Sequence, residues 1–222
     1  MKSISTTLVH RALPPERSGG SPPPLLVFLH GRGADEEDLL GLAPMLDERL
    51  FLVSAQAPFP FEYGGYTWYD ITTSEVPDPV RFRESCGRLH QFLLDVRTGY
   101  AVDPARVFLF GFSMGCVMSY AMALTAPELV RGVSANSGYV PEGTHLDFRW
   151  LDLQQVEFFV THGTQDPIIP VSLARRAEAL LKASNATLTY REYPAGHELT
   201  EEGLRETGGW LKGLIEKSTI GK

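Results

Sequence analysis

The chain contains 222 residues, of which 43% are hydrophobic, and it carries a formal net charge of −7. This length and hydrophobic content suit one α/β domain with a sizeable core, so we expect a single domain over residues 1–222. The acidic balance and the lack of a polybasic stretch exclude the electrostatic footprint of a protein that binds nucleic acid or an anionic membrane surface.

Strand-like and helical patterns alternate along the sequence. Strand-like runs occur near Thr6–His10, Leu25–Leu29, Leu50–Ser54, Arg106–Phe110, Val130–Ala135, Val156–Thr161 and Thr187–Tyr193. Helical patterns occur at Glu36–Pro44, Arg81–Thr98, Met114–Thr125, Leu173–Ala183 and Thr200–Glu216. Such alternation favours an α/β fold, with a mostly parallel central sheet and helices on both faces.

A glycine-rich loop, His30–Ala34, follows the strand predicted at Leu25–Leu29. Glycines allow such a loop to turn backbone N–H groups toward a ligand, and in serine hydrolases a loop of this kind supplies one donor of the oxyanion hole. We assign that donor to the N–H of Arg32. The alternative is a tight turn without a binding role.

An aromatic segment between Pro58 and Pro79 interrupts the alternation. It is rich in glycine and proline, and it contains Trp68 and Tyr69. A long loop without secondary structure of its own is more often functional than not. We therefore interpret residues 58–79 as a lid or pocket wall that brings Trp68 near the nucleophile. The alternative is a surface loop, anchored by its aromatic side chains, that covers the sheet edge.

A serine flanked by two glycines, in Gly111-Phe-Ser113-Met-Gly115, follows the apolar run Arg106–Phe110. This pattern is typical of a nucleophile elbow, a sharp turn between strand and helix that exposes the serine hydroxyl to a base and to the substrate. Glycine is expected on each side because a Cβ there would collide with the neighbouring strand or the start of the helix. The backbone N–H of Met114 is then the second oxyanion donor.

The base and acid that would activate Ser113 are expected to follow it in the order acid, then histidine. Three histidines follow Ser113: His145, His162 and His197. His162 ends an apolar run and reads as a hydrogen-bonded residue that closes a strand. Asp166 lies just after that strand, and His197 follows the last strand-like run, so both would reach the edge of the sheet where ligands bind. Taken alone, Asp166 could be a turn or cap residue, and His197 an exposed loop residue.

These motifs together resemble the phospholipase/carboxylesterase family of α/β-hydrolases, which includes acyl-protein thioesterases and small bacterial carboxylesterases. The similarity covers nearly the whole chain and rests on Leu29-His-Gly-Arg-Gly-Ala34, Trp68-Tyr-Asp-Ile71, Gly111-Phe-Ser-Met-Gly115, Ser137-Gly138-Tyr139, His162-Gly-Thr-Gln-Asp-Pro167, Ile169-Pro170-Val171 and Gly196-His197. The resemblance implies that Ser113 is the nucleophile, Asp166 the acid and His197 the base. Many members have glutamine where this chain has Met114, which bears on substrate preference because the oxyanion donor itself is a backbone group.

We therefore expect a serine esterase that cleaves carboxylic esters of short to medium acyl chain through an acyl-enzyme, without cofactor or metal. Trp68, Tyr69 and Ile169 are the candidate substrate-binding residues. The alternative within the family is a thioesterase or lysophospholipase that acts on long acyl chains. An acyltransferase or haloperoxidase-like use of the same triad also stays open, whereas a catalytically silent protein would normally have lost a triad residue. Chemistry of the dienelactone-hydrolase type is disfavoured because it places cysteine at the elbow.

The remaining features bear on location and partners. Cys86 and Cys116 are too few for a disulfide framework or a metal site. The sequence shows no apolar run long enough for a signal peptide or a membrane span, so we expect a cytoplasmic protein without stable membrane association. Its expected partner is a small ester substrate, and the sequence leaves open whether the protein forms a homodimer.

Overall fold

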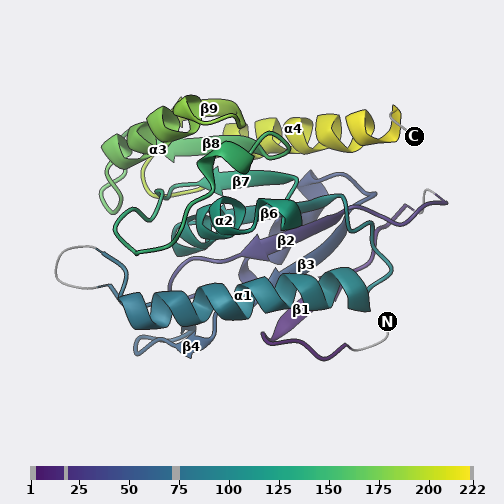
Figure 1. The fold of residues 1–222 in the computed structure, drawn as a ribbon, viewed down its shortest axis with the longest axis horizontal. Coiled ribbons are helices and arrows are strands. Elements are labelled where there is room, and N and C mark those ends of the chain that lie inside the picture. The colour runs from purple at the N-terminus through teal and green to yellow at the C-terminus, as the bar shows by residue number, and fades with distance from the viewer. Residues whose placement is uncertain (1–3, 18–19, 72–75, 221–222) are drawn as a thin grey trace.

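The computed structural model describes residues 4–17, 20–71 and 76–220. Its main sheet has seven strands in the order β1-β3-β2-β6-β7-β8-β9. The strands are β1 (His10–Leu13), β2 (Leu25–Leu29), β3 (Phe51–Ala55), β6 (Val107–Phe112), β7 (Gly132–Asn136), β8 (Glu157–Gly163) and β9 (Thr187–Tyr193). Only β1 pairs antiparallel with its neighbour, which confirms the mostly parallel sheet. The strand order can be followed in Figure 1 from β1 and β3, near α1, to β8 and β9, near α3 and α4.

Helices cover both faces of this sheet, as predicted. The α-helices are α1 (Pro79–Gly99), α2 (Met114–Thr125), α3 (Val171–Ala183) and α4 (Glu201–Ile220), and short 3₁₀ helices are η1 (Asp38–Met45), η2 (Pro127–Leu129) and η3 (Trp150–Asp152). Successive side chains of a strand point to opposite faces. Accordingly, Val27 belongs to the core formed with α1, α2 and α3, while its neighbour Phe28 belongs to the core formed with α4 and η1.

Three predicted elements differ from the structure. The first strand begins at His10 instead of Thr6, because the Thr6 hydroxyl donates to the carbonyl of Leu8 and pairing with β3 starts only at His10. The helix expected at Glu36–Pro44 is the 3₁₀ helix η1, which contains Pro44; proline has no N–H to donate within a helix. The segment 58–79 is not devoid of secondary structure.

That segment contains a small hairpin formed by β4 (Phe59–Pro60) and β5 (Tyr66–Thr67), which pair antiparallel. An isolated bridge also joins Ile71 to Pro77. The N–H of Gly33 donates to the carbonyl of Tyr66 at 2.9 Å, so the hairpin is fastened to the loop that follows β2. The hairpin is therefore part of the wall beside that loop.

Parallel strands bring the loops at their carboxyl ends to one edge of a sheet. In this protein the loops that follow β2, β6, β8 and β9 carry Arg32, Ser113, Asp166 and His197, respectively. The strand order places β6, with Ser113, between β2 and β7 near the centre of the sheet. The fold thus collects four candidate site residues from distant parts of the sequence.

Candidate active site

Ser113 lies at a sharp turn between β6 and α2 with φ 55° and ψ −118°. A residue other than glycine adopts such a conformation at a cost of about 1–3 kcal/mol, and such strain gathers at functional sites. The flanking glycines are required by close packing: a Cβ on Gly115 would lie 1.8 Å from the carbonyl oxygen of Leu29 in β2, and one on Gly111 would lie 2.3 Å from the carbonyl oxygen of Gly115. The expected collisions with the neighbouring strand and the helix start are therefore confirmed.

Asn136, at the end of β7, is hydrogen-bonded to the backbone of this turn. Its carbonyl accepts the Ser113 N–H at 3.0 Å, and its side-chain Nδ2 donates to the carbonyl of Gly111 at 3.1 Å. The Thr161 hydroxyl in turn donates to Oδ1 of Asn136 at 2.8 Å. Asn136 is buried and fixes the elbow through backbone contacts. No sequence motif indicated this role of Asn136. The one sign of it in the sequence is a polar residue at the end of a largely apolar strand.

Ser113, His197 and Asp166 form one hydrogen-bonded chain. Nε2 of His197 lies 2.9 Å from Oγ of Ser113, and Nδ1 lies 2.7 Å from Oδ2 of Asp166. An ionised carboxylate only accepts hydrogen bonds, so Nδ1 carries the proton and Nε2 is left free to accept from the serine hydroxyl. The Phe112 ring packs against the imidazole with 5.1 Å between centroids. The geometry is that of a hydroxyl in contact with an oriented base.

The carboxylate of Asp166 is held by the loop that follows β8. Its Oδ1 accepts from the N–H groups of Ile168 and Ile169, both at 2.8 Å. Burial alone would raise the pKa of Asp166, but these two hydrogen bonds and the one from His197 outweigh it and hold the pKa below its usual value. Asp166 therefore stays ionised next to His197. The structure places Ile169 in this loop, where its backbone supports the acid.

A second histidine contacts the same carboxylate. Nε2 of His162 lies 2.8 Å from the carbonyl oxygen of Ile169 and 3.3 Å from Oδ2 of Asp166. Burial lowers the pKa of His162, so the imidazole is neutral. Both neighbours are acceptors, which puts the single ring proton on Nε2. The expected role of His162, a hydrogen-bonded residue at the end of a strand, matches its place in β8.

The loop after β2 presents its backbone to Ser113. A Cβ on Gly31 would lie 3.3 Å from Cδ1 of Phe112 and 3.4 Å from Cβ of Ser113, so this part of the loop packs against the elbow. Buried His30 accepts the Ala57 N–H on Nε2 at 3.0 Å and therefore donates from Nδ1 to the carbonyl of Gly31 at 2.6 Å. The C=O and N–H of a trans peptide point in opposite directions. By holding the Gly31 carbonyl, His30 thus turns the N–H of Arg32 the other way.

Trp68 supports this loop from within the core. Its indole Nε1 donates to the carbonyl of His30 at 2.9 Å, and its ring is fully buried. The Ser85 hydroxyl donates to the carbonyl of Trp68. The structure therefore brings Trp68 behind the loop that faces Ser113, and the side chain has no surface exposed to a cavity. Substrate contact by Trp68 stays a prediction.

Met114 faces the hairpin. Its sulfur lies 3.3 Å from the Thr67 hydroxyl, which also donates to the carbonyl of Tyr69 at 2.7 Å. The Met114 side chain thus packs against β5, while its backbone N–H lies at the start of α2. Neither this N–H nor that of Arg32 has a hydrogen-bond acceptor among the residues that the structure describes.

A cavity of about 460 Å³ lies beside the hairpin and the Arg32 loop. Polar and charged side chains make up most of its wall, which is formed by Arg32, Pro60, Phe61, Glu62, Thr67, Tyr69, Asp70, Ile71 and Arg81. Of the three residues predicted to bind substrate, only Tyr69 lines this cavity. The compact pocket beside the loop is therefore more polar than the aromatic sequence of residues 58–79 suggested.

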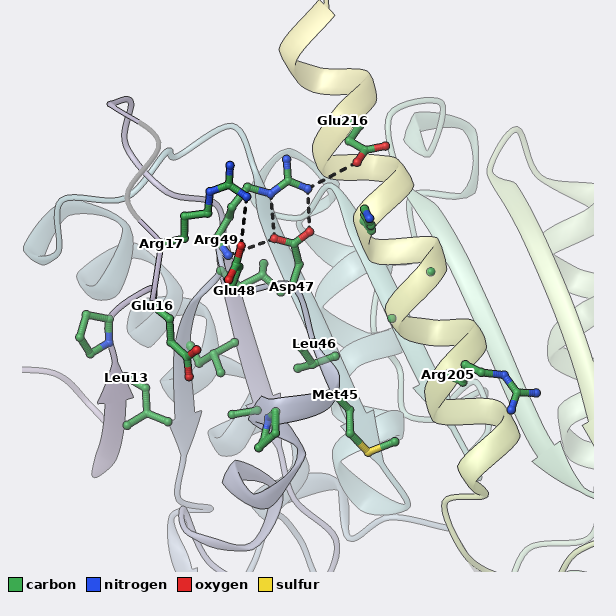
Figure 2. Close-up of a pocket in the computed structure, with 18 of the residues that line it drawn as sticks. Leu13, Glu16, Arg17, Met45, Leu46, Asp47, Glu48, Arg49, Arg205 and Glu216 are labelled. Atoms are coloured by element: carbon green, nitrogen blue, oxygen red, sulfur yellow. Dashed lines mark hydrogen bonds and ion pairs between the residues drawn. The ribbon is translucent and has the colours of Figure 1, made fainter.

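A larger hollow of about 830 Å³ lies elsewhere, between α4, the end of β1 and the start of β3. Figure 2 shows that ion pairs cross it, with Arg49 between Asp47 and Glu216 and with Arg17 next to Glu48. Its wall includes none of the candidate catalytic residues. The smaller cavity has Arg32 in its wall, and its wall residue Thr67 contacts Met114, the neighbour of Ser113, whereas Ser113, Asp166 and His197 do not line it.

Both cysteines of the chain are free and buried. Burial raises the pKa of Cys86 to about 12 and that of Cys116 well above its usual value, so both thiols are poor nucleophiles. Within residues 4–17, 20–71 and 76–220, no group of three or more His, Cys, Asp or Glu side chains is placed to hold a metal ion. No helix in the same part of the chain is long and apolar enough to cross a membrane.

Comparisons with known proteins identify the family and the fold. The model of the phospholipase/carboxylesterase family matches residues 16–215. Acyl-protein thioesterase 1 of Candida albicans is 25% identical, over 90% of this chain and 96% of that protein. A probable carboxylesterase, SOBER1-like, of Arabidopsis thaliana is 24% identical over 77% of this chain and 68% of that protein. The crystal structure of a Bacillus cereus carboxylesterase superposes with a TM-score of 0.83 at 22% identity, covering 93% of this chain and 94% of the other, which shows a shared fold.

Proposed function

The chain belongs to the phospholipase/carboxylesterase family, and from this membership we propose that it is a serine esterase with Ser113, His197 and Asp166 as its catalytic triad. The observation that carries the proposal is the hydrogen-bonded chain from Ser113 Oγ to His197 at 2.9 Å and from His197 to Asp166 at 2.7 Å. Both distances suit proton transfer without rearrangement. We also propose that residues 1–222 act as one catalytic domain.

In the proposed reaction, Ser113 Oγ attacks the ester carbonyl while Nε2 of His197 takes the hydroxyl proton. Asp166 stabilises the imidazolium that forms. The tetrahedral intermediate then collapses, the C–O bond to the alcohol breaks, and His197 returns the proton to the departing alcohol oxygen. A water molecule, activated by the same imidazole, attacks the acyl-enzyme and releases the acid. These steps need no cofactor.

The oxyanion of each intermediate would be bound by the N–H groups of Arg32 and Met114. Both lack acceptors within the described chain, and His30 and Trp68 hold the loop that carries the first of them. Preorganised donors of this kind strengthen their contact only as negative charge develops, and losing one typically costs about 2.7–4 kcal/mol of barrier. Strain at Ser113 and fixed donors around it are consistent with a site built before substrate arrives.

We propose carboxylic esters of short to medium acyl length as substrates. Each buried methylene adds up to about 0.8 kcal/mol while a pocket has room, so kcat/KM should rise over the first few carbons and then level off. A thioesterase or lysophospholipase acting on long chains is the second candidate, favoured by the named relative from Candida albicans. It would show a steady rise out to palmitoyl substrates. A cytoplasmic location and the absence of stable membrane association stay predictions from the sequence.

A fluorophosphonate probe tests the nucleophile directly, since it phosphonylates an activated serine. The intact protein should be labelled at Ser113, Ser113→Ala should not react, and the exposed serine variant Ser172→Ala should react like wild type. Turnover of p-nitrophenyl butyrate should follow the same pattern. Full-rate labelling of Ser113→Ala would overturn the assignment.

A further inference from the structure

The side chain of Arg32 is exposed at the cavity beside the β4–β5 hairpin. Its guanidinium lies over the Phe61 ring, 5.3 Å from the centroid, and within the described part of the chain no carboxylate lies at ion-pair distance from it. Arg81, which lines the same cavity, is instead paired with Asp70 at 2.9 Å. Among the described residues, the cavity therefore contains one cation paired with a carboxylate, Arg81, and one without such a partner, Arg32.

The role inferred for Arg32 rests on the proposed function, in which its backbone N–H binds the oxyanion. The same residue offers its backbone N–H to the oxyanion and its guanidinium to the cavity, so a group held by the guanidinium lies within one arginine side chain of the scissile carbonyl. The loop is held in place because the Gly33 N–H donates to Tyr66, and because Gly65 packs so closely that a Cβ would lie 2.2 Å from the Gly33 carbonyl oxygen. The backbone of the loop that carries Arg32 is thus held in place, and the guanidinium lies over the Phe61 ring.

A planar guanidinium recognises a carboxylate through two parallel hydrogen bonds, which gives it geometric selectivity that a lone ammonium lacks. We propose that the preferred substrates are esters that carry a carboxylate a few bonds from the ester carbonyl, and that Arg32 is the residue that selects them. Glu62 also lines the cavity, on the hairpin turn. Together with Asp70 it balances the charges of Arg32 and Arg81, so the proposed preference depends on the geometry of the Arg32 guanidinium and not on a net positive charge of the cavity.

The test compares kcat/KM for esters of matched size and different charge. Monoethyl succinate, glutarate and adipate place the carboxylate in the acyl part, and the acetate esters of glycolate and 3-hydroxypropionate place it in the alcohol part. Ethyl pentanoate is the neutral reference, and ethyl 4-aminobutyrate the cationic one. One anionic series should exceed the neutral reference by on the order of tenfold, and the cationic ester should be the poorest substrate. The advantage should shrink as salt is added, because an exposed ion pair is screened.

Variants assign this preference to one side chain. The ratio of kcat/KM between the best anionic ester and its neutral reference should fall to about one in Arg32→Gln. Arg32→Lys should give an intermediate ratio, because lysine keeps the positive charge but cannot donate two parallel hydrogen bonds to a carboxylate. Arg205→Gln, on α4 at the other hollow, removes the same charge and should leave the ratio at the wild-type value. Glu62→Gln should raise the ratio.

Two kinds of failure are distinguishable. If the fluorophosphonate does not label Ser113 and no ester is turned over, the proposed function fails and the inference falls with it. If Ser113 is labelled and neutral esters are hydrolysed as fast as both anionic series, only the inference is overturned. A ratio that stays unchanged in Arg32→Gln would also overturn it.

Discussion

His162 contacts Asp166 through Nε2, which lies 3.3 Å from Oδ2 of the carboxylate, and both side chains are completely buried. The same oxygen accepts the hydrogen bond from His197. Two imidazoles of different function therefore meet at one carboxylate. His197 also contacts Oγ of Ser113, whereas His162 also contacts the carbonyl of Ile169, in the loop that carries Asp166.

This contact predicts that His162 positions Asp166. His162→Leu removes a donor near a charged acceptor, a loss of roughly 1.5–3 kcal/mol, so kcat should fall by about one to two orders of magnitude. His162→Gln restores an N–H donor and should recover much of that loss. Circular dichroism should show both variants folded. Equal activity of wild type and His162→Leu would contradict the positioning role.

Asp166→Asn should lower turnover by on the order of 10⁴, the scale of the equivalent change in a serine protease. The N–H groups of Ile168 and Ile169 would hold the amide oxygen in the place of Oδ1, which leaves the amide NH₂ facing His197. His197 would then have to carry its proton on Nε2, facing Ser113. Steady-state kinetics with p-nitrophenyl butyrate measures the effect.

Glu192→Gln is the matched control for that change. Hydrogen bonds from Arg175 and Tyr190 lower the pKa of Glu192 to about 2, so its carboxylate is already committed to partners outside the triad. The variant should keep activity close to that of wild type. If Glu192→Gln or Glu178→Gln were more damaging than Asp166→Asn, the acid would be misassigned.

The pH dependence of kcat/KM should show an acid limb with a slope of one. The pKa of Asp166 is held below its usual value, so its carboxylate stays ionised through the acid limb and adds no second proton to the loss of activity. A histidine base must be neutral to accept the serine proton, so activity is present at higher pH and lost as pH falls. A limb of slope two would mean that Asp166 titrates as well, and a flat profile between about pH 5 and 8 would contradict a histidine base.

Two glycine substitutions should have opposite effects on stability. Gly115→Ala places a Cβ 1.8 Å from a backbone oxygen of β2, which the core cannot absorb, so the free energy of unfolding should fall by at least about 1–3 kcal/mol. Gly87→Ala, inside α1 with no atom within 4 Å of the new Cβ, should raise it by roughly 0.5–1 kcal/mol. Thermal unfolding measures both. A wild-type melting temperature for Gly115→Ala would contradict the packing argument.

Trp68→Phe separates two roles for this residue. The variant loses the indole donor to the His30 carbonyl, worth about 1 kcal/mol net, so kcat/KM should fall roughly fivefold for every ester of a chain-length series. Trp210→Phe, at a tryptophan that packs against Phe159, is the control. A shifted chain-length optimum in Trp68→Phe would instead indicate contact with the acyl chain, as the sequence predicted.

Local patterns were enough to predict most of the fold. The strands β2 and β9 and the helix α2 have the predicted bounds, because the apolar run of β2, the run of threonine and tyrosine residues in β9 and the elbow motif before α2 mark them. The first strand begins at His10 instead of Thr6, because the bounds of this short edge strand are determined by its pairing with β3 and not by its own composition. The hairpin within residues 58–79 was missed because strands of two residues leave no periodic signal.

For the site, the sequence by itself determined which residue types were available and in what order: a serine at a glycine-flanked turn, then Asp166, then His197. Chemistry at an elbow requires small neighbours and a base later in the chain, so those residues stand out locally. Only the tertiary structure decided what each buried polar group contacts. Asn136 under the elbow, His30 behind the Arg32 peptide, and His162 beside Asp166 act across strands, and the partners of a hydrogen bond between distant segments are set by how the sheet packs. The same packing turned Trp68 into the core and left Arg32 at the cavity.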